Sequence, residues 1–116
     1  MEVRARDRAE PFTTKDGSTI RELLGRGTTA NQSLAEATLA PGQATQRDYH
    51  AETEDIYYIV DGAGEMEVDG ERAQVGPLDA ILIPPRARHQ LTAGPDGCRL
   101  LCCCAPAYSH EDTYFD

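Results

Sequence analysis

The sequence predicts an all-β protein, built as a sandwich of two sheets or as a closed barrel. Roughly six to eight short segments rich in β-branched and aromatic residues follow one another, separated by turn signals about every 8 to 12 residues. No segment has the periodicity of a convincing amphipathic helix. The chain has 116 residues, which suffices for one modest hydrophobic core but not for two. We therefore expect a single domain.

The first third of the chain predicts an arm, a short segment that is either a strand or one helical turn, and a strand. Residues 1–17 are polar and form an expected N-terminal arm, ordered only where other segments hold it. Residues 19–24 are too short a run for periodicity to separate a strand from one helical turn. Residues 33–39 alternate as a strand does, and the pair Pro41-Gly42 ends it with a turn.

The rest of the chain predicts further short strands. Asp69-Gly70 between two alternating runs is the signal of a type I′ hairpin. We expect residues 94–97, Gly-Pro-Asp-Gly, to form a loop, and Pro106 to end the last strand. The barrel then covers residues 18–106 and a polar tail covers residues 107–116. The expected strands of this part are 45–50, 55–61, 65–68, 72–75, 80–83, 89–93 and 98–104.

Charge and hydropathy exclude several classes of partner. The formal net charge is -9, which argues against nucleic acid, because such binders offer Lys and Arg to phosphate. No run approaches the roughly 20 apolar residues of a membrane span. The charged N-terminus lacks the apolar region of a signal peptide. We therefore expect a cytoplasmic protein that binds a small molecule.

The cysteines predict packing rather than chemistry. The sequence has four, of which Cys102, Cys103 and Cys104 are consecutive. In a strand, Cys102 and Cys104 share one face and Cys103 lies on the other. Free cysteine is among the most buried residue types, and the paired C-x-x-C spacing of a thiolate metal site is absent. We expect small buried residues and no disulfide framework.

Histidine and carboxylate side chains predict a metal site. Asp48 and His50 are two residues apart, so they lie on one face of a strand. His89 would join them from a strand distant in sequence. Imidazole nitrogen and carboxylate oxygen suit divalent Mn, Fe, Co, Ni or Zn. Tyr57 follows Asp55 by two residues and should share its face, either lining the pocket or packing in the core.

The spacing of these residues resembles that of the cupin superfamily. The first cupin motif is Gly, five residues, His-x-His, three or four residues, Glu, six residues, Gly. Here Gly42 and five residues lead to Asp48, Tyr49 and His50, and Asp55 and Gly62 follow at the same spacings. Two positions differ from the motif, because Asp48 replaces its first histidine and Asp55 its glutamate.

The second cupin motif is also present in spacing. It runs Gly, five residues, Pro-x-Gly, two residues, His, three residues, Asn. Here Leu78 and five residues lead to Pro84, then Arg86, His89 and Ala93. Leu78 and Arg86 replace glycines, which suggests slightly different turns. The ending CCCAPAYSHEDT is similar to small single-domain cupins that carry a mannose-6-phosphate isomerase-like label.

The resemblance implies a jelly-roll β-barrel with a divalent metal, Fe, Mn, Ni or Zn, inside it. The implied ligands are Asp48, His50, Asp55 and His89. Aspartate is one methylene shorter than glutamate, about 1.5 Å less reach. Asp55 therefore binds after a backbone shift or through water, or Glu54 replaces it after a local bulge. A three-ligand site of two histidines and one carboxylate, as in non-haem Fe(II) oxygenases, is the fourth alternative.

Two functions fit the resemblance. In the first, the protein is a metal-dependent enzyme that acts on a small polar organic molecule by isomerase, lyase or dioxygenase chemistry. In the second, it is a non-catalytic binding or sensor module with a weakened or absent metal site. If Asp48 and Asp55 turn into the barrel, the enzyme function is favoured. If they pair with Arg47 or Arg88, the binding module is favoured. The resemblance and the small core also predict a homodimer.

Overall fold

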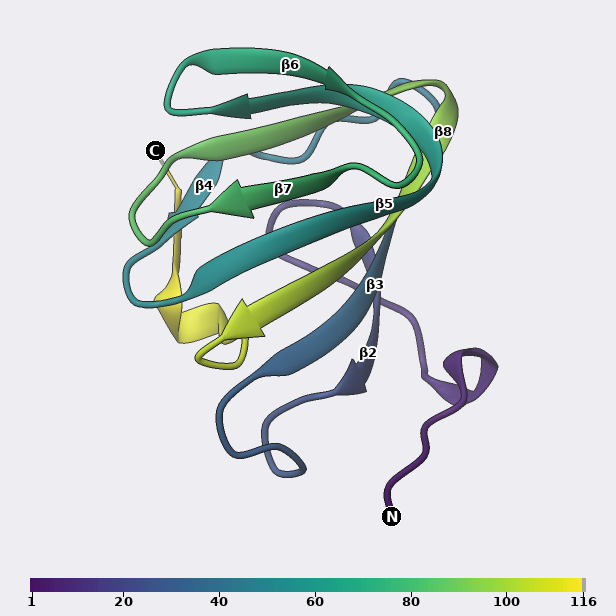
Figure 1. Cartoon of the computed structure of the whole chain (residues 1–116), viewed down its shortest axis with the longest axis vertical. Helices are drawn as coiled ribbons and strands as arrows, with labels where there is room; N and C mark the ends of the chain where they lie inside the picture. The colour runs from purple at the N-terminus through teal and green to yellow at the C-terminus, as the bar shows by residue number, and fades with distance from the viewer. Residues whose placement is uncertain (116) are drawn as a thin grey trace.

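The computed structural model describes residues 1–115, and in these the chain forms a sheet of nine strands curled into a barrel (Figure 1). Two short 3-10 helices, Arg6–Arg8 and His110–Asp112, lie near the ends. The all-β expectation is confirmed, and the segment at residues 19–24 is a strand. The strands are β1 (Phe12–Thr13), β2 (Thr19–Leu24), β3 (Ser33–Leu39), β4 (Asp48–His50), β5 (Glu54–Val68), β6 (Glu71–Val75), β7 (Ala80–Ile83), β8 (His89–Ala105) and β9 (Thr113–Phe115).

Two long strands, β5 and β8, form the central wall of the barrel and pair antiparallel along most of their length. Each was expected as two strands, and the expected loop at residues 94–97 was wrong. Gly62 pairs with Cys98 and Gly64 with Ala93, so residues 94–97 form an irregular bulge within one strand. The glycines and the proline of residues 94–97 predict a break in the strand. The strand β8 nevertheless pairs with β5 on both sides of this bulge.

The tail is part of the sheet. Its strand β9 pairs with β4, so that Tyr49 lies opposite Tyr114 and His50 opposite Thr113. Residue 116, the last of the predicted tail, lies outside the described residues. The Asp112 carboxylate accepts hydrogen bonds from the backbone N–H groups of the three residues that follow β4. These contacts fasten the tail over the connection between β4 and β5.

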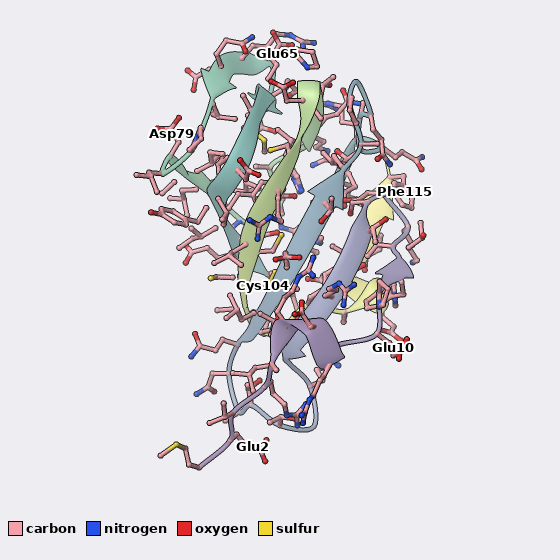
Figure 2. The ribbon with its side chains drawn as sticks, turned by 90° about the vertical axis from the view of Figure 1, so that its right-hand side faces the viewer. Glu2, Glu10, Glu65, Asp79, Cys104 and Phe115 are labelled. Carbon is pink, nitrogen blue, oxygen red and sulfur yellow. The ribbon has the colours of Figure 1, made fainter. Side chains whose placement is uncertain are left out.

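The arm is also held in place. Arg6 donates to Glu36 of β3 over 2.9 Å, and Arg99 of β8 donates to the other oxygen of the same carboxylate over 3.2 Å. Glu36 is buried between these two arginines, and their positive charges offset the cost of burying its carboxylate. Figure 2 shows the arm with Glu2 and Glu10 running along this side of the barrel.

The turns at Leu78 and Arg86 have the backbone conformation that glycine would adopt at these two positions of the cupin motif. Leu78 and Arg86 have φ of 74° and 72°, in the left-handed region that favours glycine. The expectation of different turns was therefore wrong, because the fold imposes these angles on non-glycine residues. Asp69 and Gly70 both have positive φ, which confirms the type I′ hairpin between β5 and β6.

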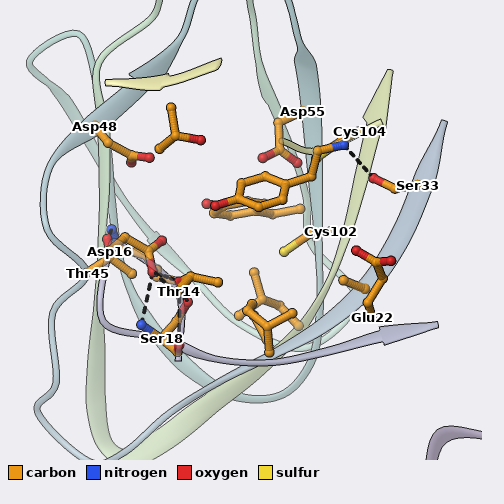
Figure 3. A pocket seen from close by; sticks show the side chains of 18 of the residues that line it. Thr14, Asp16, Ser18, Glu22, Ser33, Thr45, Asp48, Asp55, Cys102 and Cys104 are labelled. Atoms are coloured by element: carbon orange, nitrogen blue, oxygen red, sulfur yellow. Dashed lines mark hydrogen bonds between the residues drawn. The ribbon is translucent and has the colours of Figure 1, made fainter. Parts of the chain in front are cut away.

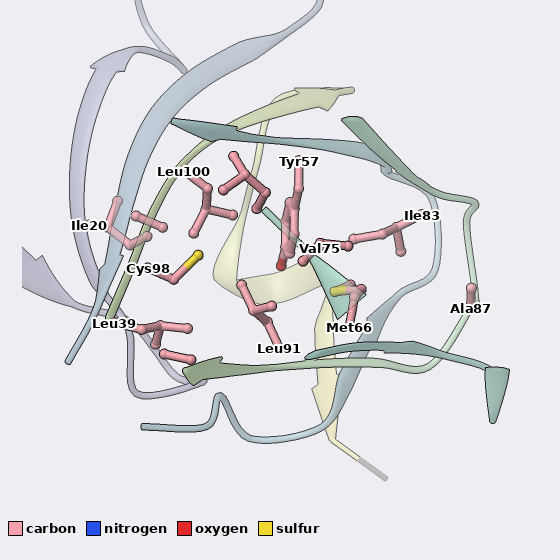
Figure 4. Packing of buried hydrophobic residues seen from close by; sticks show 13 residues of the cluster. Ile20, Leu39, Tyr57, Met66, Val75, Ile83, Ala87, Leu91, Cys98 and Leu100 are labelled. Carbon is pink, nitrogen blue, oxygen red and sulfur yellow. The ribbon is translucent and has the colours of Figure 1, made fainter. Parts of the chain in front are cut away.

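Buried apolar side chains from several strands pack together inside the barrel (Figure 4). Ile59, Leu91 and Leu100 are almost fully buried there. Of the cysteines, Cys98 and Cys104 are buried and Cys103 is exposed, and all four are free. No helix among residues 1–115 is long and apolar enough to cross a membrane.

Gly62→Ala is expected to destabilise the protein by at least about 2 kcal/mol, measured by chemical unfolding. Gly62 has a φ of 77°, and an added Cβ would lie 2.2 Å from the Gly97 carbonyl oxygen. Gly70→Ala is the matched control, since φ there is 88° but nothing lies within 4 Å of the added Cβ. Gly70→Ala should cost only the backbone strain of about 1 kcal/mol. Equal losses in the two variants would contradict the steric explanation.

Candidate metal centre

Strand pairing brings three potential metal ligands to one place. In the pairing of β4 with β8, Asp48 lies directly opposite His89. His50 follows Asp48 by two residues on the same face, as the sequence predicts. One ligand atom each of Asp48, His50 and His89 lies within 4.8 Å of the others, and all three residues are buried. These residues form the candidate metal centre.

The His89 ring presents an unprotonated nitrogen to the pocket. Its Nδ1 lies 3.0 Å from the carbonyl oxygen of Ala87. A carbonyl oxygen can only accept, so Nδ1 carries the proton and Nε2 carries a lone pair. Burial lowers the pKa of His89, which keeps the ring neutral. Nε2 lies 3.3 Å from Oδ1 of Asp48.

The His50 ring is held in the same tautomer by the tail. Its Nδ1 lies 3.3 Å from the hydroxyl oxygen of Thr113, and that hydroxyl donates to the carbonyl oxygen of Ser109 over 2.9 Å. With its proton committed to Ser109, Thr113 accepts from Nδ1, so Nε2 of His50 also carries a lone pair. Burial lowers the pKa of His50 as well.

The acceptors in this centre lack donors. Oδ1 of Asp48 is buried without a hydrogen-bond partner, although the Nε2 lone pair of His89 faces it. Burial raises the pKa of Asp48 to about 8, with smaller contributions from the charges of Asp16 and Asp55. Lone pairs that converge on one point are unfavourable unless a proton or a cation lies between them. Two imidazoles and a carboxylate so arranged fit a divalent transition metal.

Asp55 lies beside the centre. Its Oδ2 is 3.8 Å from Nε2 of His50, and its Oδ1 is buried without a partner. Burial raises the pKa of Asp55 to about 7. Glu54 is exposed and outside the pocket, because neighbours in a strand point to opposite faces and the register of β5 is regular there. The idea that a bulge brings Glu54 inward was therefore wrong.

Arg47 and Arg88 have partners other than the two buried aspartates. Arg47 donates instead to Glu67 over 2.8 Å, and Arg88 stacks on the Tyr49 ring 3.7 Å from its centroid. Both carboxylates are turned inward, to 2 % exposure for Asp48 and 3 % for Asp55. This is the arrangement that favours a metal site over surface salt bridges.

Asp48 and His50 of the centre, together with Asp55, line a pocket that opens to solvent (Figure 3). Tyr57 lines this cavity, and its ring meets that of His89 edge to face at 6.1 Å. Asp16 of the arm and Thr113 of the tail are among the lining residues that the sequence did not predict. Their local sequence carries no signal of this role, because only pairing with distant strands brings them to the cavity.

Thr113→Val is expected to weaken binding of Zn(II) by about 10- to 100-fold, the usual cost of removing an outer-shell partner of a metal-bound histidine. Valine keeps the shape but cannot accept from Nδ1 of His50. Thr113→Ser, which keeps the hydroxyl, should restore the affinity. A competition titration with a chromophoric chelator measures both. Equal affinities for the valine and serine variants would rule out a positioning role for this hydroxyl.

Comparison with known proteins identifies the family. The cupin domain matches residues 35–104. The uncharacterised protein MJ1618 of Methanocaldococcus jannaschii is 45 % identical over 112 residues, which cover 92 % of this chain and 88 % of that protein.

Solved structures share the fold. A protein from Planctomyces limnophilus superposes with a TM-score of 0.87 at 21 % identity, covering 99 % of this chain and 96 % of its own. The polyketide cyclase RemF from Streptomyces resistomycificus superposes with a TM-score of 0.80 at 24 % identity, covering 97 % and 89 %. At these identities the likeness concerns the fold. With the family match over residues 35–104, it shows that this chain belongs to the cupin family and forms a small cupin domain with the jelly-roll barrel.

Proposed function

We propose that the protein is a metal-dependent cupin enzyme that acts on a small organic molecule inside the barrel. Asp48, His50 and His89 are the proposed ligands of the metal. The observation that carries this proposal is the fixed tautomer of both histidines, which leaves each Nε2 with a lone pair next to a buried aspartate whose Oδ1 lacks a donor. If these residues only stabilised the fold, their buried acceptor atoms would be paired with hydrogen-bond donors.

The residues of the chain have distinct roles in this proposal. The Ala87 carbonyl and Thr113 hold the two rings in the ligating tautomer. Burial raises the pKa of Tyr57 well above its usual value, so its hydroxyl remains a proton donor that can orient an oxygen of the substrate. The apolar lining excludes bulk water. A bound divalent ion would supply Lewis acidity toward such an oxygen.

The reaction class is proposed only as isomerase, lyase or dioxygenase chemistry. Two histidines with one carboxylate leave open coordination positions, as in non-haem Fe(II) enzymes. RemF, which shares the fold, is a polyketide cyclase. Asp55, beside His50 and without a donor at Oδ1, is placed to hold water or substrate, or to act as a fourth ligand. The alternative, a non-catalytic binding module, requires a cavity that binds its ligand without metal.

Metal content tests the proposal. The protein is purified without chelator and without a His tag, and its metals are measured by inductively coupled plasma mass spectrometry. We expect close to one ion of Fe, Mn, Ni or Zn per chain, retained through gel filtration. If the purified protein holds no metal and takes up none of the four on titration, the metalloenzyme proposal is wrong and the binding module replaces it.

We also propose that the protein is a homodimer, formed through the outer face of β5 and β7. Ile56, Leu82 and Tyr58 are 40 %, 56 % and 38 % exposed on this face, and Ile56 lies directly opposite Leu82. A second copy covers such a face through self-complementary packing. Light scattering at micromolar concentration should give twice the chain mass of 12.7 kDa, and Ile56→Lys should give the monomer. A monomeric parent protein would contradict this proposal.

A further inference from the structure

We propose that the pocket accepts an uncharged molecule that carries a ring and oxygen groups, and that it excludes anions such as phosphorylated or carboxylated sugars. This inference rests on the proposed function, because it names the substrate class of the same site. Its basis is the distribution of charge and apolar surface over the lining of the cavity.

The lining carries negative charge and no positive charge. Its carboxylates are Asp16, Glu22, Asp48 and Asp55, and none of the described residues that line it is lysine or arginine. Proteins bind phosphate and carboxylate groups with arginine, lysine or the N-terminus of a helix. The helices of residues 1–115 are two 3-10 turns of three residues each. Within residues 1–115, the pocket therefore lacks the cationic side chains and helix N-termini that would bind an anion.

A bound metal does not reverse this charge. The two positive charges of a divalent ion are balanced by ionised Asp48 and Asp55, which leaves Asp16 and Glu22. Without metal, no cationic side chain in the described lining offsets Asp16 and Glu22. An anion that enters the pocket meets a net negative surface in either state.

Asp16 contributes most directly to this repulsion. The arm places it in the wall of the cavity, where Figure 3 shows it with Asp48 and Asp55 around the same space. Its Oδ1 accepts from the hydroxyl of Thr14 and, over 2.9 Å, from the backbone N–H of Ser18. These donors are uncharged, so they fix the position of the carboxylate without neutralising it.

The other half of the lining is apolar. Ile20, Ala37, Leu39, Leu91 and Leu100 meet there beside the ring of Tyr57. A ligand with hydroxyl groups on every side would desolvate those groups against this wall without giving them partners. A ring with an apolar face covers it, while oxygens on the opposite side face His50 and the buried carboxylates.

Paired probes test the charge preference. Isothermal titration calorimetry at pH 7.5 compares 2-naphthol, which is uncharged, with 2-naphthoate, which has the same rings and a carboxylate. The titrations use both metal-free and Zn(II)-loaded protein. We expect 2-naphthol to bind at least about tenfold more tightly in both forms. Asp16→Asn should raise the affinity for 2-naphthoate by about three- to tenfold and leave that for 2-naphthol unchanged.

Controls separate the effect of Asp16 from other causes. Asparagine can keep the turn that Asp16 forms with Ser18, and thermal melts check the fold. Glu71→Gln removes one charge on the exposed strand β6, away from the cavity, and should change neither affinity. Equal or tighter binding of 2-naphthoate, or no binding of 2-naphthol up to millimolar concentration, would overturn the inference. Failure of the proposed function would appear separately, as an absence of metal uptake.

Discussion

His89→Ala is expected to lower the affinity for Zn(II) by at least about 100-fold, because it removes a metal ligand itself, which costs more than loss of an outer-shell partner. The same loss is expected for His50→Ala. In each case one of the two Nε2 lone pairs that face Asp48 and Asp55 disappears. Chelator competition measures the affinity, and the metal content of the purified variants gives an independent reading.

The third histidine provides the matched control. His110 lies on the exposed 3-10 helix of the tail and contacts Tyr108, outside the candidate metal centre. His110→Ala should bind metal as the parent does. Because His50 and His89 are buried, His50→Gln and His89→Gln accompany the alanine variants to limit loss of packing. Full metal binding by the folded His50 and His89 variants would show that the ligands lie elsewhere.

The metal-free protein is expected to lose about 2 kcal/mol of stability between about pH 6.5 and pH 8. Burial raises the pKa of Asp48 from 3.8 to about 8 and that of Asp55 to about 7. The folded state then binds more protons than the unfolded state, so this stabilisation is complete below about pH 4, falls as pH rises above that, and is gone once pH passes about 8. The lowered pKa values of His50 and His89 act in the opposite direction, but only below about pH 6.5.

Urea unfolding at several pH values measures this dependence, and saturating Zn(II) should abolish or reverse it, because the metal requires the ionised carboxylate. Asp48→Asn should stabilise the metal-free protein at pH 8 by about 1 to 2 kcal/mol, since the new amide can donate to Nε2 of His89. The same variant should lose metal affinity. Asp96→Asn, at an exposed position, serves as the control and should leave the profile unchanged. Stability that rises from pH 6.5 to 8 in the metal-free protein would contradict the prediction.

The sequence by itself determined the strands and one part of the site. Alternation of side chains predicts β3, and turn residues set the bounds of β6 and β7, because both signals are local properties of the sequence. The same periodicity places Asp48 and His50 on one face, and Asp69-Gly70 determines its hairpin because two-residue turns depend on local φ preferences. These features need no knowledge of distant residues.

Only the tertiary structure decided how distant residues meet. The register of β4 with β8 places His89 opposite Asp48, and the pairing of β9 with β4 brings Thr113 to His50. The continuous strand through residues 94–97 and the left-handed backbone of Leu78 likewise contradict the local pattern. Pairing partners and register are set by the packing of the whole barrel, which no short segment encodes. The candidate ligands could therefore be named from the sequence, whereas their tautomers, their missing donors and the charge of the pocket required the fold.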